Sequence, residues 1–145
     1  MATINATINV SSDIMSYPTT INKTMTMKKL ASCHGLEEST GFRTKKFGLV
    51  TTAAVIVEED ELTDAKAHKV YIRNTTSNKN NFFYVAYNGS AAGALTTEVI
   101  GKLYGGDWML FPFNGATGIT VASDGVIEQT LEYIVFADGI ATAKG

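Results

Sequence analysis

The fold of this chain is decided by residues 100–125, IGKLYGGDWMLFPFNGATGITVASDG, in which glycine turns separate short apolar runs. The runs are rich in Val, Ile, Phe, Tyr and Thr, which favour β-strands. Gly, Asn-Gly and Asp-Gly supply the positive φ angles that tight hairpins need. The same spacing continues on both sides of the stretch and predicts an antiparallel β-sheet. The turns are Asn88-Gly89, Gly105-Gly106, Asn114-Gly115, Asp124-Gly125 and Asp138-Gly139.

Apolar runs of strand length recur from residue 46 to residue 138. Seven or eight short strands at this spacing are typical of an antiparallel β-sandwich or jelly roll. The fold class expected is therefore all-β. The predicted strands cover residues 47–57, 67–74, 82–87, 98–104, 108–113, 117–122 and 128–136.

Three of the predicted strands are apolar on both faces. They are residues 82–87, 108–113 and 128–136. A strand of this kind needs cover on both sides, whereas a sandwich of this size normally leaves one face of each sheet wet. The excess apolar surface therefore indicates an interface between subunits.

The first 45 residues differ from the rest because they contain few large apolar side chains. Residues 2–10 alternate in a way that predicts a half-buried strand, residues 24–30 predict a second one, and residues 31–44 look irregular. Such a segment cannot form a core alone. We expect an extended N-terminal arm over residues 1–45 and a sandwich domain over residues 46–145. The arm is expected to dock on its own domain or on neighbouring subunits, and the predicted interface residues are Ile4, Ile8, Val10, Tyr17, Met25 and Met27, together with Trp108.

Composition excludes several classes of function. The chain has 145 residues, 18% charged residues and a net charge of −2, so no basic surface for nucleic acid is expected. Its one cysteine, Cys33, cannot form an internal disulfide. No signal-peptide pattern and no apolar run long enough for a membrane span is visible. The low charge and the many Thr, Asn and Ser residues suit a surface that packs against other proteins.

No motif for catalysis or metal binding is found. Cys33-His34 and His68 supply too few ligands for zinc, and two histidines are too few for a cupin-like enzyme. Residues 58–61 and Asp64 are acidic but lack the spacing of an EF-hand loop; a solvated loop is favoured over an interfacial Ca²⁺ site. Residues 88–93 lack the Lys-Ser/Thr of a phosphate loop and suit a hairpin tip. We therefore expect no enzyme, no cofactor and no metal.

Trp108, which follows the Gly105-Gly106-Asp107 turn, has three possible roles. The favoured interpretation is a core anchor, with Asp107 capping the backbone of the turn. The alternatives are a stacking platform for a sugar and a side chain at a subunit interface.

Six segments together resemble small virion structural proteins of tailed bacteriophages, especially phages of cyanobacteria and other marine bacteria. The resemblance covers roughly residues 67–137 and carries no catalytic residues. It implies a role in assembly, as a capsid decoration or cement protein or as a head–tail or tail accessory part. The segments are VYIRNT (70–75), FYV (83–85), IGKLYGGDW (100–108), FPF (111–113), ITVA (119–122) and LEYIVF (131–136).

The function expected from the sequence is a non-enzymatic bacteriophage virion protein that stabilises the capsid by binding neighbouring capsid subunits. The expected partners are further copies of the chain, with a trimer as one option, and the major capsid protein or other virion proteins. The expected location is the virion, assembled in the host cytoplasm, without contact to nucleic acid or membrane. The alternative is a head–tail, tail or fibre accessory protein with a carbohydrate-binding β-sandwich.

Overall fold

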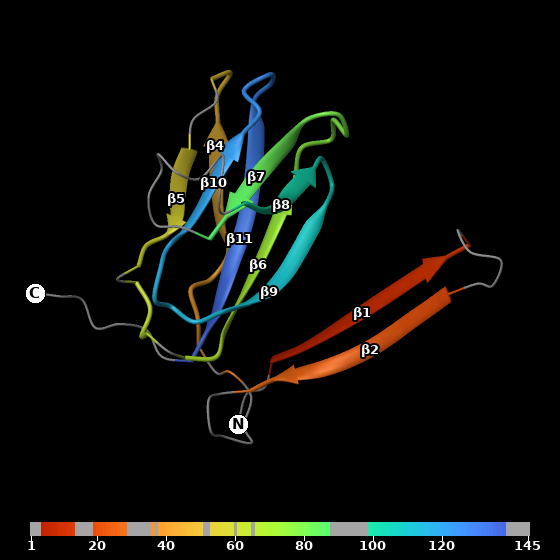
Figure 1. Cartoon of the computed structure of the whole chain (residues 1–145), viewed down its shortest axis with the longest axis vertical. Coiled ribbons are helices and arrows are strands. Elements are labelled where there is room, and N and C mark those ends of the chain that lie inside the picture. The colour runs from red at the N-terminus through yellow and green to blue at the C-terminus, as the bar shows by residue number, and fades with distance from the viewer. Residues whose placement is uncertain are drawn as a thin grey trace, which may run out of the picture.

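The chain forms antiparallel β-sheets, as a computed structural model shows (Figure 1). The structure describes residues 4–13, 19–28, 36, 38–50, 53–59, 61–64, 66–87 and 99–138, and these contain eleven strands and no helix. Nine strands form two sheets that pack face to face, and the first two form a separate hairpin. The prediction of an all-β antiparallel sandwich is confirmed.

The larger sheet has five strands, with β11 at its centre. β6 pairs with β11 on one side and with β9 on the other, so that β9 forms one edge. β3 and β4 both pair with the opposite side of β11. The strands are β3 (Glu38–Ser39), β4 (Arg43–Phe47), β6 (His68–Asn74), β9 (Trp108–Phe113) and β11 (Gln129–Ala137).

The smaller sheet has four strands in the order β5-β10-β7-β8, all antiparallel. β10 is buried along its whole length and lies in the middle of this sheet, with Ile119 and Val121 facing the core under the larger sheet. The strands are β5 (Ala53–Val57), β7 (Phe82–Ala86), β8 (Val99–Tyr104) and β10 (Ile119–Ser123).

The core lies between the two sheets and follows the two-residue period of the strands. Val70 and Ile72 of β6 and Leu131 and Val135 of β11 point inward from the larger sheet. Phe83 of β7 meets them from the smaller sheet and packs edge-on against Phe47, with ring centroids 5.0 Å apart. The rest of the cluster is Ile56, Val57, Leu62, Val85, Leu103, Phe113, Ile119, Val121, Tyr133 and Ala137.

The glycine turns do not join hydrogen-bonded hairpins. Gly106, Gly115 and Gly125 have φ angles of 91°, 85° and 74°, which confirms the predicted left-handed conformation. However, each turn carries the chain from one sheet to the other, because β8 and β10 lie in the smaller sheet and β9 and β11 in the larger one. The prediction of tight hairpins at these three turns is therefore wrong. The turns at residues 88–89 and 138–139 include residues outside the described part of the chain.

Two predicted strand boundaries also need correction. Residues 47–57 are not one strand, because β4 ends at Phe47 in the larger sheet and β5 begins at Ala53 in the smaller one. Residues 38–39 and 43–47 pair with β11, although residues 31–44 were expected to be irregular. The boundary expected after residue 45 thus falls inside β4, and the sandwich already includes residues 38–45.

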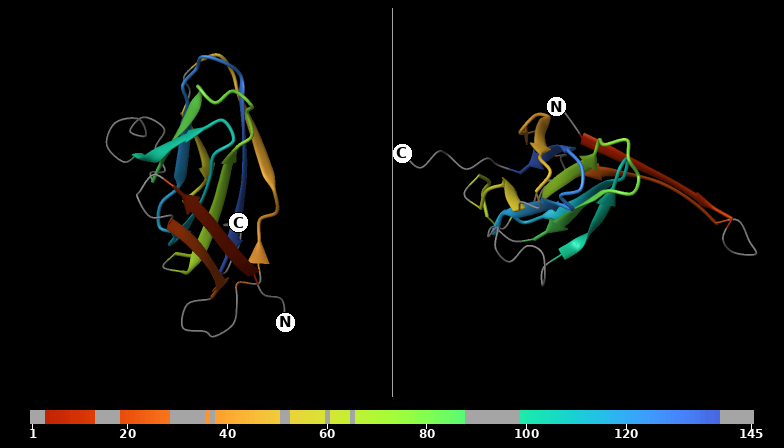
Figure 2. Two further views of the ribbon diagram at one scale, coloured as in Figure 1. Left: turned by 90° about the vertical axis from the view of Figure 1, so that its right-hand side faces the viewer. Right: turned by 90° about the horizontal axis from the view of Figure 1, so that it is seen from above.

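Part of the predicted arm is a β-hairpin. β1 (Ile4–Ser12) and β2 (Thr19–Met27) pair from Ile4 opposite Met27 at one end to Ser12 opposite Thr19 at the other. The strand expected over residues 24–30 therefore begins five residues earlier and ends three residues earlier. The hairpin starts at one end of the sandwich and extends outward beyond the sheets (Figure 2).

Candidate functional site

The hairpin has one apolar and one polar face because apolar and polar residues alternate along both strands and like residues are mostly paired. On the apolar face, Val10 lies opposite Ile21 and Ala6 opposite Met25, and the pair between them, Ile8 and Lys23, adds one charged side chain to this face. The polar face is held together by side-chain hydrogen bonds. The hydroxyl oxygens of Thr7 and Thr24 are 2.8 Å apart, and Thr26 donates to Oδ1 of Asn5 over 2.7 Å.

The apolar face of the hairpin is covered only at its base. Met27, at the base, is buried, and its carbonyl oxygen accepts a hydrogen bond from Leu36 N over 2.7 Å. Further out, the side chains are between 40% and 45% exposed. An isolated two-stranded hairpin is marginally stable in water, so this face is suited to a binding partner. The exposed side chains are Ile8, Val10, Ile21 and Met25.

The outer face of the five-stranded sheet is also apolar. Tyr71 of β6, Leu110 of β9 and Ile134 of β11 are neighbours in the ladder, because Tyr71 is the register partner of both other residues. Trp108, at the start of β9, lies on the same face, 51% exposed, with its ring centroid 6.5 Å from that of Tyr71. Phe42, just before β4, is 71% exposed.

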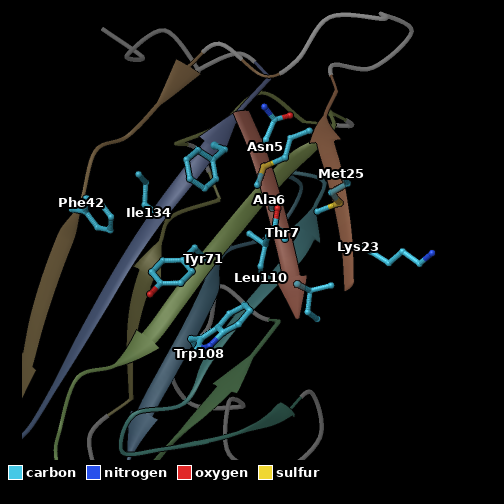
Figure 3. Close-up of a pocket in the computed structure, with 13 residues that line it drawn as sticks. Asn5, Ala6, Thr7, Lys23, Met25, Phe42, Tyr71, Trp108, Leu110 and Ile134 are labelled. Carbon is cyan, nitrogen blue, oxygen red and sulfur yellow. The ribbon is translucent and has the colours of Figure 1, made fainter. Parts of the chain in front are cut away.

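These two apolar surfaces face each other across a cleft of about 490 Å³ (Figure 3). The sheet forms one wall, and the hairpin forms the other. Lys23 is the one charged residue among the described residues that line the cleft. The lining residues are Asn5, Ala6, Thr7, Ile8, Lys23, Met25, Met27, Phe42, Tyr71, Trp108, Leu110, Ile134 and Phe136.

The chemistry that this cleft offers is burial of apolar surface. Its walls consist mainly of aliphatic, aromatic and thioether side chains, and Asn5 and Thr7 of β1 also border it. The described residues contain no group of three or more His, Cys, Asp or Glu that could hold a metal ion. An apolar surface of this shape is typical of a contact with another protein.

Four of the seven predicted interface residues meet in the cleft: Ile8, Met25, Met27 and Trp108. Ile4 and Val10 belong to the same face of the hairpin but do not line the cleft. Tyr17 lies outside the described residues.

The sequence-based prediction missed the sheet side of the cleft. Phe42, Tyr71, Leu110, Ile134 and Phe136 line it, and none of them was selected as an interface residue. A signal was present, because strands 108–113 and 128–136 were recognised as apolar on both faces. Alternation alone does not say which of the two faces is turned outward.

Trp108 does not anchor the core, so the favoured interpretation of this residue is wrong. It lies on the outer face because Met109, Phe111 and Phe113 of the same strand take the inward positions. The capping role of Asp107 is confirmed, since its Oδ2 accepts a hydrogen bond from Tyr104 N over 3.0 Å.

His68 is part of the packing at one end of the sandwich. It is fully buried, its Nε2 lies 2.8 Å from the carbonyl oxygen of Thr63, and its Nδ1 accepts a hydrogen bond from Asp138 N over 3.0 Å. Because Nδ1 accepts a hydrogen bond, the ring proton lies on Nε2, and this N–H donates a hydrogen bond to the carbonyl oxygen of Thr63. Both ring nitrogens are occupied, and Cys33 and His34 lie outside the described residues.

The acidic cluster lies in the connection between β5 and β6. Glu58 and Glu59 are exposed, as expected for a solvated loop. Glu61 forms an ion pair with Arg43 of β4, which ties the loop to the edge of the larger sheet. Asp60 lies outside the described residues, as do all of residues 88–93.

A second aromatic patch, on the outer face of the smaller sheet, is partly covered by the chain itself. Phe82 contacts Tyr84 and Tyr104, with ring centroids 4.9 Å and 5.3 Å apart. The ammonium group of Lys102 lies 4.4 Å from the centre of the Phe82 ring. The lysine stem and its cation–π contact cover this patch, in contrast to the cleft.

Among solved structures, the likeness found for this chain is weak. No family model and no curated protein matches the chain. A solved structure described as Bacillus endospore appendages, a family of disulfide-linked pili, contains a similar chain. It is 15% identical, with a TM-score of 0.36, over 74% of this chain and 97% of the other. A likeness of this size carries no argument about function. The described residues include no helix suited to crossing a membrane.

Proposed function

We propose that this protein is a non-enzymatic structural subunit that acts by binding neighbouring subunits through its N-terminal hairpin and the outer face of its larger sheet. The observation that carries the proposal is the uncovered apolar face of the hairpin, which lies opposite an apolar sheet face. Both surfaces leave apolar side chains in water, and burial of apolar area is the main driving force of association.

The assembly we propose is a bacteriophage virion, in which the protein decorates or cements the capsid. The likeness of residues 67–137 to small virion proteins supports this choice. The sandwich serves as a rigid body, and the hairpin extends from it toward a neighbour (Figure 2). The proposed partners are further copies of the chain and the major capsid protein. Many identical weak contacts on one capsid give high avidity.

A deletion experiment tests this role. The full chain and a variant that lacks residues 1–28 are incubated with purified capsids of the phage that encodes the chain, and both are sedimented with them. We expect the full chain to sediment with the capsids at high copy number and the shortened chain to stay in the supernatant. Equal retention of the two chains would refute a role of the hairpin in binding.

The shortened chain must keep its fold for this comparison to be valid. The hairpin does not pair with any described strand of the sandwich. We therefore expect the far-ultraviolet circular dichroism spectrum of the sandwich to survive the deletion, apart from the loss of the hairpin strands.

A second candidate function is carbohydrate binding by a tail or fibre accessory protein, and the exposure of Trp108 favours it. Trp108 and Tyr71 form a tilted aromatic pair, and Arg73 lies directly opposite Trp108 in the ladder. These three side chains and Gly106 line a shallow second pocket. Aromatic rings beside a guanidinium group suit the apolar face and the hydroxyl groups of a sugar. Titration of Trp108 fluorescence with cell-surface glycans of the host tests this candidate; an unchanged signal would count against it.

A further inference from the structure

Within one chain, the hairpin and the larger sheet do not bury each other's apolar side chains. They face each other across the cleft, yet Met25 is 45% exposed on one side and Trp108 is 51% exposed on the other. Sheets that pack face to face lie about 10 Å apart, with their side chains interdigitated. Here a space of about 490 Å³ remains between the two faces. The two surfaces are therefore complementary in chemistry but are not closed within one chain.

The hairpin is attached in a way that allows it to reach another molecule. Its fixed point is Met27, which is buried and hydrogen-bonded to Leu36. No described strand of the sandwich pairs with β1 or β2, so turning the hairpin about this base breaks no ladder. The opposite end, where Ser12 pairs with Thr19, lies beyond the sheets (Figure 2).

We infer that the partner of the hairpin is a second copy of this chain, and that two copies exchange their hairpins reciprocally. In this dimer, the apolar face of each hairpin packs on the outer face of the other copy's larger sheet, over Tyr71, Trp108 and Leu110. The inference rests on the proposed function, because it names the neighbour that the same surface binds. The arrangement is two-fold symmetric, so each subunit donates one hairpin and accepts one.

The area available reaches the threshold for a specific dimer only when both hairpins are exchanged. The uncovered part of the hairpin, from Ala6 to Ser12 and its partner strand, is about 24 Å long and about 10 Å wide. Two such faces and the two sheet faces that receive them bury about 1,000 Å² together, which is the lower limit for a specific interface. A single hairpin on a single sheet buries about half of this area, which favours the reciprocal arrangement.

The test uses adjacent register pairs on opposite faces of the hairpin. Val10 and Ile21 form an apolar pair, and Asn9 and Asn22 form the neighbouring polar pair. The variant Val10→Lys/Ile21→Lys places two charges in the proposed interface, whereas Asn9→Lys/Asn22→Lys places the same charges on the polar face. Masses are measured by sedimentation over a range of protein concentrations. We expect the full chain and the polar-face variant to be dimers, and the apolar-face variant to dimerise at least tenfold more weakly.

A mixing experiment identifies the surface that receives the hairpin. Trp108→Lys removes the only tryptophan and damages the receiving sheet but keeps an intact hairpin. When it is mixed with Val10→Lys/Ile21→Lys, its intact hairpin can bind the intact larger sheet of that second variant. This sheet carries the only tryptophan in the mixture, so the contact covers it. Because this single contact buries only half of the area of the reciprocal dimer, the variants are mixed at protein concentrations well above those at which the full chain dimerises. Under these conditions we expect mixing to protect that tryptophan from quenching by iodide. Absence of protection would overturn the contact between hairpin and sheet, provided that both variants show the circular dichroism spectrum of the full chain.

The outcomes separate this inference from the proposed function. If the full chain is a monomer in solution but still needs residues 1–28 to bind capsids, the exchange of hairpins is wrong and the structural role stands. If the dimer forms as described but the deletion leaves capsid binding unchanged, the exchange stands and the hairpin-mediated capsid role is wrong. Equal dissociation of the two charged variants would also overturn the exchange, because the effect would then not depend on the apolar face.

Discussion

Asn74 and Gln129 are both almost completely buried, and Nδ2 of Asn74 donates a hydrogen bond to Oε1 of Gln129 over 3.2 Å. The two amides lie on the neighbouring strands β6 and β11. Gln129 in turn donates from Nε2 to Oδ1 of Asp124 over 2.7 Å, and Asn81 donates to Oδ2 of the same carboxylate over 2.8 Å. Buried amides are costly unless they are paired. This chain of hydrogen bonds therefore fixes the turn after β10 to the larger sheet.

Removal of the central amide should destabilise the fold. Gln129→Ala leaves Asp124 without the hydrogen bond from Nε2 of Gln129 and opens a cavity, and we expect a loss of about 2–4 kcal/mol in the free energy of unfolding. Urea denaturation followed by circular dichroism measures this value. The control is the exposed neighbour, Glu128→Ala, for which a change within about 0.5 kcal/mol is expected. Equal effects at both positions would contradict the role of the network.

Gly115 should tolerate no side chain. Its φ is +85°, and a Cβ atom at this position would lie 2.7 Å from the carbonyl oxygen of Thr63 and 3.2 Å from Nε2 of His68. Backbone strain and the clash together predict a loss of about 2–4 kcal/mol for Gly115→Ala. Gly48→Ala is the matched control, since a Cβ at Gly48 meets nothing within 4 Å. Thermal unfolding of the two variants compares them, and similar melting temperatures would contradict the prediction.

Substitution of two phenylalanines should affect two different properties. Loss of Phe83 should lower the stability of the fold, and loss of Phe42 should weaken the assembly of subunits. Phe83 is fully buried between the sheets, and Phe83→Ala should lower the free energy of unfolding by about 3–5 kcal/mol. Phe42 is 71% exposed and lines the cleft, so Phe42→Ala should leave the stability of the monomer nearly unchanged and weaken assembly instead. Urea denaturation and sedimentation measure the two properties separately. A large loss of monomer stability in Phe42→Ala would show that the hairpin closes on its own sheet.

The fluorescence of Trp108 should report the accessibility of the outer sheet face. The chain contains one tryptophan, so its emission comes from this residue alone. Because the ring is about half exposed, we expect iodide to quench it strongly in the dilute protein. Quenching should decrease as the protein concentration rises and subunits associate. Weak quenching at every concentration would mean that the ring is buried within the monomer.

Most strands of the sandwich could be predicted because their boundaries depend on local signals. The bounds of β6 and β9 agree with the sequence to within one residue, since alternation of apolar residues ends where turn residues begin. The break between β4 and β5 was missed because residues 47–57 remain β-branched and apolar across the point where the chain changes sheets. Leu49 and Val50 are 66% and 70% exposed there, which no local pattern indicates.

Part of the candidate site could also be predicted, and part could not. The apolar face of the hairpin follows from alternation, so Ile8 and Met25 were found. The register of β1 with β2, which sets Ala6 opposite Met25, does not follow from the alternation within either strand. Phe42 and Tyr71 were missed because their membership of the cleft depends on where the hairpin lies relative to the larger sheet.

The sequence by itself determined the all-β class and the positive φ of the turn glycines Gly106, Gly115 and Gly125, because alternation and backbone sterics act within a few residues. The tertiary structure alone decided which sheet each strand joined and which face of a doubly apolar strand turned outward. In β9, Met109, Phe111 and Phe113 pack between the sheets, and this leaves Trp108 and Leu110 on the outside. Either set is apolar enough to be buried; the choice depends on the neighbouring strands, which are distant in sequence.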